Sequence, residues 1–174
     1  MSSSGNPRKR GDEQLPSEDP AAALAWIPAG LFVLTAQHEE RRAGIVTSLV
    51  QRVCDQPPML CLAVAKGTPI MPLISESRKF GLCQLGDGDR LLLRKFRSEL
   101  DPADDPFLGF ELRPSKLPGL PLLAQCFAQL ECELACHLDV EGDHDLFVGT
   151  VRAGHWRGEG RPWIYLGEDG EARG

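Results

Sequence analysis

The chain has 174 residues, of which 42% are hydrophobic and 25% charged, and this composition indicates one soluble globular domain with a sizeable core. Its formal net charge of -6 argues against a nucleic-acid-binding protein, because phosphate backbones favour basic surfaces. No apolar run reaches the roughly 18 residues that a membrane-spanning helix requires, so no membrane segment is expected.

Residues 1–19 contain basic side chains but no apolar segment of the kind found in secretory signals, and we expect a disordered tail. A short partner-binding or nuclear-type motif at Arg8–Arg10 is the alternative. The six cysteines form no Cys-x-x-Cys pair, so a zinc site is not expected. Without an export signal, these cysteines are expected to be reduced thiols in a cytoplasmic protein.

A short helix is predicted to begin at Pro20, because Asp19 can cap it and proline suits the first helical position. Segments 30–37 and 43–50 are rich in strand-forming residues, and the polar segment 38–42 between them suits a turn. The pattern therefore predicts an antiparallel hairpin.

The apolar segment 59–65, bounded by prolines and a glycine, is typical of a buried strand. A short helix is predicted over 69–76 and a further strand over 80–85. Residues 89–100 carry apolar side chains at helical spacing and predict an amphipathic helix. These apolar positions are Leu92, Phe96 and Leu100.

Segment 107–121 is rich in proline and glycine and is expected to be irregular. A long strand is predicted within 122–139, in which alternation places Cys132 and Cys136 toward the core. The strand 145–153 follows a turn at 141–144 and completes a second hairpin.

A last short strand is predicted at 162–166, and a frayed end at 169–174. Many strands, few helices and repeated hairpins indicate a mainly β protein, namely an antiparallel β-barrel with helical insertions, over residues 20–168.

Lys66-Gly67-Thr68-Pro69 has the features of a phosphate site. Thr68 can cap the following helix, whose N-terminus favours anions, while Lys66 adds a charge and Gly67 allows close approach to the backbone. The alternative is an ordinary capped helix beside a surface lysine.

Other polar residues have similar pairs of interpretations. Thr47 and Ser48 lie in an apolar strand, where they meet the polar edge of a flat ring or make local bonds. His144 either exchanges protons with a ligand or is a solvated turn residue. The basic run 94–97 either neutralises a phosphate or forms a solvated helix face.

Several segments carry a family resemblance: 44–58 with the AKGTPIMPLI stretch after it, Leu93-Arg94-Lys95-Phe96, Leu130-Glu131-Cys132, Gly142-Asp143-His144 and Phe147-Val148-Gly149. In this order and spacing they resemble the flavin reductase-like, FMN-binding split-barrel family, and in particular the flavin reductase domain of diflavin flavoproteins. The resemblance covers residues 22–167.

The resemblance implies a split-barrel homodimer that binds FMN, or FAD, near the subunit interface. It also implies hydride transfer from NADH or NADPH to the flavin, which would serve a partner oxygenase or another electron acceptor. The flavin would carry the redox chemistry, while the protein supplies binding and orientation.

Site residues can be carried over from the resemblance one by one. The flavin ring would be lined by Thr47, Ser48, Leu49 and Val50. The ribityl phosphate would be held by Ala65, Lys66 and Thr68, and the basic-aromatic segment would contribute Lys95 and Phe96. His144 would be the catalytic residue, near the ring and the nicotinamide.

Four positions depart from the family pattern. The family often has hydroxyl residues at Val46, Leu49 and Cys54, and commonly an asparagine at Cys83. Ring contacts made through the backbone would survive these changes. Two alternatives therefore stay open: a flavin-binding carrier or sensor module with little turnover, and a split-barrel interaction domain that has lost its flavin.

Overall fold

A computed structural model of the chain describes residues 19–98 and 104–166. The predicted tail, apart from its last residue, and the predicted frayed end lie outside these residues, as does Leu100.

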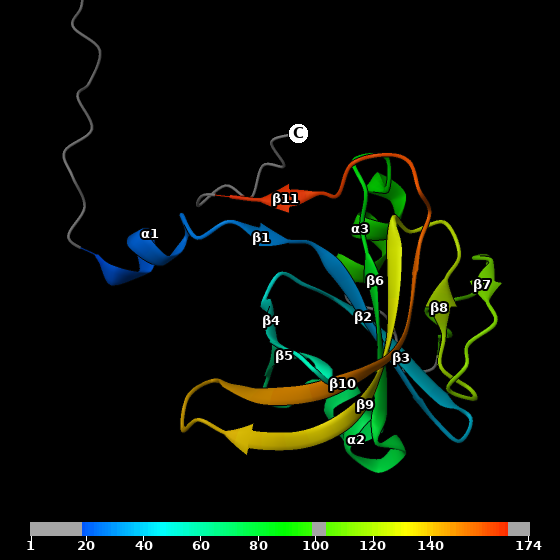
Figure 1. Ribbon diagram of the computed structural model, residues 1–174, viewed down its shortest axis with the longest axis horizontal. Coiled ribbons are helices and arrows are strands. Elements are labelled where there is room, and N and C mark those ends of the chain that lie inside the picture. Colours follow the sequence, from blue (N-terminus) through cyan, green and yellow to red (C-terminus); the bar gives the residue numbers. More distant parts are fainter. Residues whose placement is uncertain (1–18, 99–103, 167–174) are drawn as a thin grey trace, which may run out of the picture.

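Seven strands form one antiparallel sheet in the order β3-β2-β6-β9-β10-β5-β4. Their bounds are β2 (Phe32–His38), β3 (Arg41–Thr47), β4 (Val50–Asp55), β5 (Pro58–Ala65), β6 (Lys79–Gln84), β9 (Ala128–Asp139) and β10 (His144–Trp156). The sheet is strongly curved (Figure 1). Strands β3 and β4 follow one another in the chain but lie at the two edges of the sheet. They do not pair with each other, so the barrel is open between them. The predicted mainly β, split-barrel architecture is confirmed.

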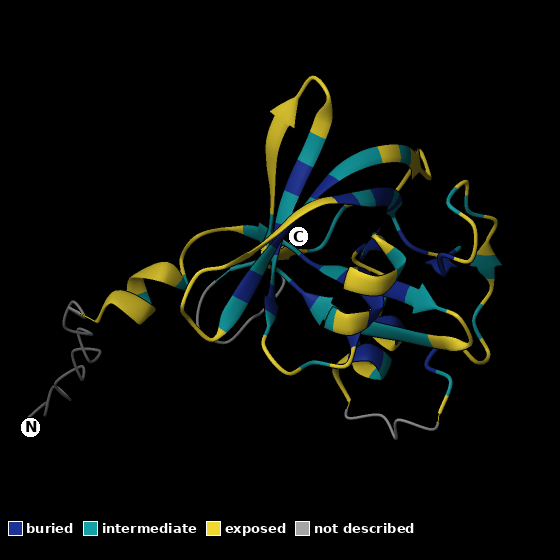
Figure 2. Cartoon of the chain, turned by 90° about the horizontal axis from the view of Figure 1, so that it is seen from below, coloured by how far each residue is buried: buried dark blue, intermediate teal, exposed yellow. Residues whose placement is uncertain are grey.

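Two short pairs and three helices complete the described structure. The paired strands are β1 (Ala29–Gly30) with β11 (Ile164–Tyr165), and β7 (Leu112–Arg113) with β8 (Leu122–Leu123). The helices are α1 (Pro20–Leu24), α2 (Ile70–Ser77) and α3 (Arg90–Arg97). Helix α2 packs on β2, β3, β6 and β9, and α3 packs on β3. Helix α1 lies outside the sheet and is largely exposed (Figure 2).

The core has two parts because β2 is buried on both faces. Leu34 faces a cluster with Phe80 and Phe147 that lies between the sheet and α2. Val33, its neighbour, faces a second cluster, which contains Leu92 and Phe96 of α3. Alternate strand residues point to opposite faces, so one strand serves both clusters.

The hairpin predicted from 30–37 and 43–50 is confirmed as β2 and β3, but the second strand is shorter than expected. It ends at Thr47, whose Oγ1 accepts a hydrogen bond from Leu49 N at 3.1 Å. This local bond turns the chain, and Val50 then begins β4.

The amphipathic helix predicted over 89–100 is α3, with Leu92 and Phe96 buried as expected. The cap predicted for α1 is also confirmed, since Asp19 accepts a hydrogen bond from Ala21 N.

Two local predictions were wrong. Thr68 does not cap α2: its hydroxyl donates to the carbonyl of Ala65 at 2.9 Å, and the helix begins at Ile70. Cys136 is exposed, whereas Cys132 is buried. The pairing of β9 with β10 shifts between Leu134 and Cys136, and such a bulge reverses which face the next residues occupy.

Candidate functional site

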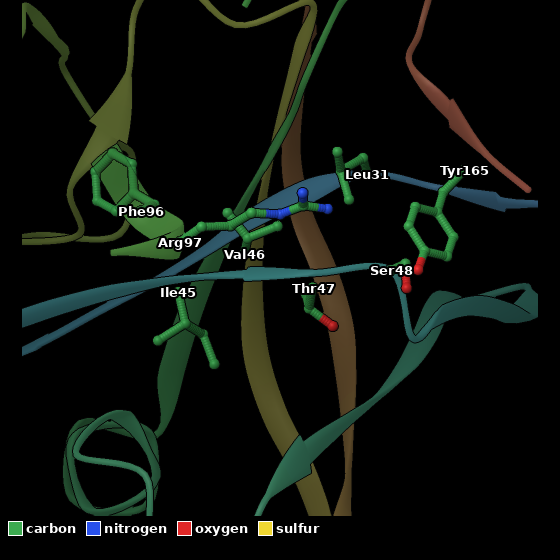
Figure 3. A pocket seen from close by; sticks show the side chains of 8 residues that line it. All are labelled: Leu31, Ile45, Val46, Thr47, Ser48, Phe96, Arg97 and Tyr165. Atoms are coloured by element: carbon green, nitrogen blue, oxygen red, sulfur yellow. The ribbon is translucent and has the colours of Figure 1, made fainter. Parts of the chain in front are cut away.

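A pocket of about 290 Å³ opens beside the end of β3. Its described lining residues are Leu31, Ile45, Val46, Thr47, Ser48, Phe96, Arg97 and Tyr165 (Figure 3). They come from four parts of the chain: the segment after β1, strand β3 with the residue that follows it, the end of α3, and β11. The pocket thus combines apolar walls with hydroxyls and one guanidinium, a mixture typical of sites for small organic ligands.

Thr47 and Ser48, which the sequence analysis expected to line a flavin ring, both line this pocket. Figure 3 shows Ile45 and Thr47 extending to one side of β3 and Val46 to the other. Thr47 is buried, and its hydroxyl oxygen already accepts from Leu49 N. Ser48 is half-buried, and within the described residues its hydroxyl makes no hydrogen bond. Of these two hydroxyls, that of Ser48 is therefore the freer to meet a ligand.

Leu49 and Val50, also predicted to line a ring, connect the pocket to β5. The carbonyl of Leu49 accepts from Ala63 N at 3.0 Å, and Val50 pairs with Leu62. The side chain of Leu49 is 51% exposed, so it can contact a ligand, whereas Val50 packs against the core.

The predicted phosphate segment and the predicted catalytic histidine meet at the ends of β5 and β10. Ala65 pairs with His144 in the register of the two strands, and Lys66 N donates to the carbonyl of Asp143 at 2.9 Å. Residues far apart in the sequence thus come together. They form a second group, joined to the pocket through the Leu49–Ala63 contact.

Lys66 is held by two carboxylates. Its Nζ lies 2.7 Å from Oδ1 of Asp139 and 3.4 Å from Oδ1 of Asp145. The hydrogen bond to Asp139 raises the pKa of Lys66 and lowers the pKa of Asp139. Lys66 therefore faces anions of its own chain at the place where the sequence predicted a phosphate.

Asp145 also contacts a histidine, a pair that no sequence pattern indicated. Nε2 of His137 lies 2.8 Å from Oδ2 of Asp145, and the His137 ring stacks on Phe147 at 4.3 Å between centroids. The side chain of Asp145 is only 9% exposed. One sequence feature could have indicated the burial of Asp145. Side chains alternate between the two faces of β10, and this places Asp145 on the same buried face as Phe147.

His144 has a carboxylate partner in its neighbour. Its Nδ1 lies 2.8 Å from Oδ1 of Asp143, and this contact lowers the pKa of Asp143. An ionised carboxylate only accepts hydrogen bonds, so Nδ1 carries the proton and Nε2 is left for another partner. The side chain of His144 is 32% exposed, so Nε2 can be reached from solvent.

The basic-aromatic segment divides between the core and the pocket. Phe96 is 4% exposed and packs on Phe107 with ring centroids 5.5 Å apart, and it also lines the pocket. Lys95 is not among the lining residues; its charge acts on Asp105 instead. Arg97 and Tyr165 do line the pocket. The sequence suggested Arg97 only within the basic run 94–97, as one of two interpretations, and gave no indication for Tyr165.

None of the described helices is long and apolar enough to cross a membrane. Within residues 19–98 and 104–166, no group of three or more His, Cys, Asp or Glu side chains could hold a metal ion.

The chain is similar to known proteins both in sequence and in fold. The family described as "Flavin reductase like domain" matches residues 24–170. Diflavin flavoprotein A 1 of Synechocystis sp. is 31% identical over 133 residues, which are 76% of this chain and 23% of that protein. The chain therefore spans about a quarter of the length of that relative.

Two solved structures have similar folds. The NADH:FAD oxidoreductase SgcE6 of Streptomyces globisporus superposes with a TM-score of 0.81 at 22% identity, covering 88% of this chain and 89% of that one. The styrene monooxygenase flavin reductase of Pseudomonas putida S12 superposes with a TM-score of 0.73 at 23% identity, covering 88% and 94%.

Proposed function

Because the chain belongs to the flavin reductase-like domain family, we propose that it is an oxidoreductase that reduces a bound flavin with NADH or NADPH. The observation that carries this proposal is the pocket beside Thr47 and Ser48, in the strand where the family resemblance expects the flavin. The two similar structures, a NADH:FAD oxidoreductase and a flavin reductase, support the same activity.

The residues of the pocket fit a flavin. Leu31, Val46 and Phe96 give an apolar surface against which a flat ring can pack. Ser48 and Tyr165 offer hydroxyls, and the exposed side chain of Leu49 can cover the ring from the adjoining turn. We place the ring against residues 47–50, with FMN or FAD as the nucleotide.

When bound, the flavin would accept the hydride. The protein's part in the reaction is to bind, orient and exchange protons. His144 is the proposed catalytic residue, because Asp143 holds Nδ1 and leaves Nε2 to orient the nicotinamide or to move a proton. Strand β5 links His144 to the pocket. Its residue Ala65 pairs with His144, and its residue Ala63 donates to the carbonyl of Leu49.

A homodimer is part of the proposal and is supported by the outer face of the β9-β10-β5 region. In the register of these strands, Leu138, Leu146 and Ala63 form one row across the face. Leu138 is 49% exposed, and the next row contains Cys136, Val148 and Cys61. A continuous, partly exposed apolar row of this kind is suited to contact with a second copy.

We further propose that the reduced flavin serves a partner oxygenase or another electron acceptor, and that the protein acts in the cytoplasm. The flavin reductase of styrene monooxygenase, which has the same fold, supports the first point.

Visible absorption of the purified protein with added FMN, recorded before and after anaerobic NADH or NADPH, tests the activity. Binding of FMN followed by bleaching on addition of a nucleotide is the expected result, and it identifies the donor. Bound flavin that is never bleached would favour the carrier or sensor module. Failure to bind FMN or FAD would refute a flavin-dependent function.

A further inference from the structure

We propose that Arg97 makes the pocket bind the reduced flavin ring more tightly than the oxidised ring, because its positive charge faces the negative charge that the ring gains on reduction. This inference rests on the proposed function, since it takes a flavin ring as the ligand of the pocket. It goes beyond that function by giving one side chain a redox role: Arg97 raises the potential at which the bound flavin accepts electrons.

The charge balance of hydride transfer creates the difference between the two ring states. A hydride is a proton with two electrons, so its transfer from NADH or NADPH leaves a positively charged nicotinamide ring and adds one negative charge to an uncharged flavin ring. That charge is spread mainly over the pyrimidine part of the flavin, and the flavin phosphate does not change. A fixed charge beside the ring therefore acts chiefly on the reduced form.

The pocket contains one such charge. Arg97 is the one charged residue among its described lining residues, and these include no carboxylate. Within residues 19–98 and 104–166, the guanidinium of Arg97 makes no ion pair or hydrogen bond, so no described group neutralises it. The chain as a whole has a net charge of -6, so the positive charge of the pocket is a local feature.

The position of Arg97 at the end of α3 explains how the charge can be held there. The last turn of α3 contains Arg94, Lys95 and Arg97, and the carbonyl end of a helix favours cations. Of these three residues, Arg97 is the one that lines the pocket, whereas the charge of Lys95 acts on Asp105. The helix end thus stabilises a charged Arg97 at the pocket without a carboxylate partner.

The polar and apolar parts of the pocket favour one orientation of the ring. Figure 3 shows Ser48 and Tyr165 at one end of the pocket and Phe96 at the other, with the guanidinium of Arg97 between them. Neither hydroxyl bonds to another described residue, so both can bond to the oxygens and nitrogens of the pyrimidine part. The dimethylbenzene part suits the Phe96 end, and the charge gained on reduction would then lie on the side of the guanidinium and the hydroxyls.

The surroundings of the guanidinium set the size of the effect. Leu31 is 2% exposed and Phe96 4%, so the inner wall of the pocket is packed against the core and lowers the local dielectric. Arg97 itself is exposed, and solvent screens its charge from the other side. A moderate preference for the reduced ring is therefore expected.

The experiment measures this preference with FMN as the probe in wild type, Arg97→Gln, Arg97→Lys and Arg90→Gln. Fluorescence quenching gives the dissociation constant of oxidised FMN. An anaerobic titration with dithionite gives the midpoint potential of bound FMN, and its difference from free FMN gives the ratio of the oxidised and reduced dissociation constants. The phosphate is the same in both states, so its contribution cancels from the ratio.

Arg90→Gln is the matched control. It removes an exposed arginine from the start of the same helix, about 10 Å along the axis from Arg97 and outside the described lining of the pocket. Both glutamine variants keep a polar side chain that can donate hydrogen bonds, so they remove the charge with little change in size.

We expect Arg97→Gln to reduce the preference for reduced FMN by about 5- to 30-fold, which lowers the midpoint potential of the bound two-electron couple by about 20–45 mV. The dissociation constant of oxidised FMN should change less than about 3-fold, because the oxidised ring is uncharged. Arg97→Lys should retain most of the preference, since it keeps the charge. Arg90→Gln should give the wild-type potential.

Three results would overturn the inference. An unchanged potential in Arg97→Gln, with both ring states weakened equally or not at all, would mean that Arg97 only shapes the pocket. An Arg97→Lys protein that loses the preference as fully as Arg97→Gln would show that charge is not the cause. An equal shift in Arg90→Gln would assign the effect to the general charge of the helix.

Failure of the proposed function gives different results. Absence of FMN binding in wild type would refute that function and the inference with it. Because dithionite supplies the electrons, the potential can be measured even if neither NADH nor NADPH reduces the bound flavin. In that case the reductase activity would be refuted, while the comparison of Arg97→Gln with wild type would still decide the role of Arg97.

Discussion

Nδ1 of His144 lies 2.8 Å from Oδ1 of Asp143, the residue before it, at the point where β10 pairs with the end of β5. Because the Asp143 carboxylate can only accept, Nδ1 of His144 donates this hydrogen bond, and Nε2 is left for another partner. A ring held in one tautomer at a strand end can meet the same substrate atom in each cycle, without a search over orientations.

His144→Ala is therefore expected to lower the rate of flavin reduction at saturating flavin by about 10- to 100-fold, while flavin affinity changes less than about 3-fold. Asp143→Asn should have a smaller effect of the same kind, since the ring remains but its tautomer is no longer imposed. Stopped-flow absorbance under anaerobic conditions measures the rate directly.

His155→Ala, an exposed histidine on the same strand, is the control and should retain the wild-type rate. If the His144→Ala rate matched it, His144 would have no part in the reaction.

The contacts of Lys66 predict an effect on stability. Its removal leaves the buried carboxylate of Asp145 with His137 as its remaining partner, and an uncompensated buried charge is unfavourable. We expect Lys66→Met to lower Tm by about 2–5 °C. Adding Asp145→Asn should restore part of the loss, because the charge that needed compensation is gone.

Differential scanning calorimetry of the single and double variants makes this comparison. A Lys66→Met protein that melts with the wild type would show that the two carboxylates do not depend on the ammonium.

Arg42 and Asp105 predict a pH dependence of stability. Nε of Arg42 donates to Oδ1 of Asp105 at 2.7 Å, Nη2 donates to Oδ2, and the guanidinium lies over the ring of Phe107. The hydrogen bond from Arg42 lowers the pKa of Asp105 below its usual 3.8. The pair therefore stabilises the fold above the unfolded-state pKa, and this contribution is lost as pH falls through the lower folded-state pKa.

At pH 7, Asp105→Asn should lower the free energy of unfolding by about 1 kcal/mol, since both side chains are about one-third exposed. The difference from wild type should shrink below about pH 4. Urea unfolding at a series of pH values tests this expectation, and a difference that stays constant down to pH 2 would contradict it.

Gly149 predicts a steric effect in the core. A Cβ at this position would lie 2.4 Å from Cζ of Phe80 and 2.8 Å from its Cε1, and Phe80 is fully buried. Gly149→Ala should therefore destabilise the fold by about 1–3 kcal/mol through overpacking.

Gly142→Ala in the hairpin turn is the control, because nothing lies within 4 Å of its added Cβ. Equal unfolding midpoints for the two variants would mean that Phe80 can move aside at little cost.

Most strands could be predicted because their pattern is local. Residues 59–65 are apolar between prolines and a glycine, and they fold as β5 (Pro58–Ala65). The side-chain direction of Cys136 could not be predicted by the same reasoning. It depends on a bulge in the pairing of two strands, and a bulge leaves no periodic signal in one strand alone.

The candidate site was only partly readable from the sequence, for a related reason. Thr47, the last residue of β3, and Ser48, the residue after it, lie within the family-like segment 44–58, and both line the pocket. Tyr165 reaches the pocket only through pairing of β11 with β1, which connects distant parts of the chain. The charges facing Lys66 come from β9 and β10, so its partners depend on tertiary structure that the four residues of its own turn do not contain.

The pairing of β1 with β11 rests on a ladder of two residues from each strand. So small a ladder opens by local fluctuation more readily than the central sheet, and amide hydrogens there should exchange with solvent early. A ligand that contacts Tyr165 would bind the closed form in preference and slow that exchange. The affinity of the pocket then includes the free energy needed to keep the two ends of the domain together, and a substitution such as Ala29→Pro could weaken a ligand that it never touches.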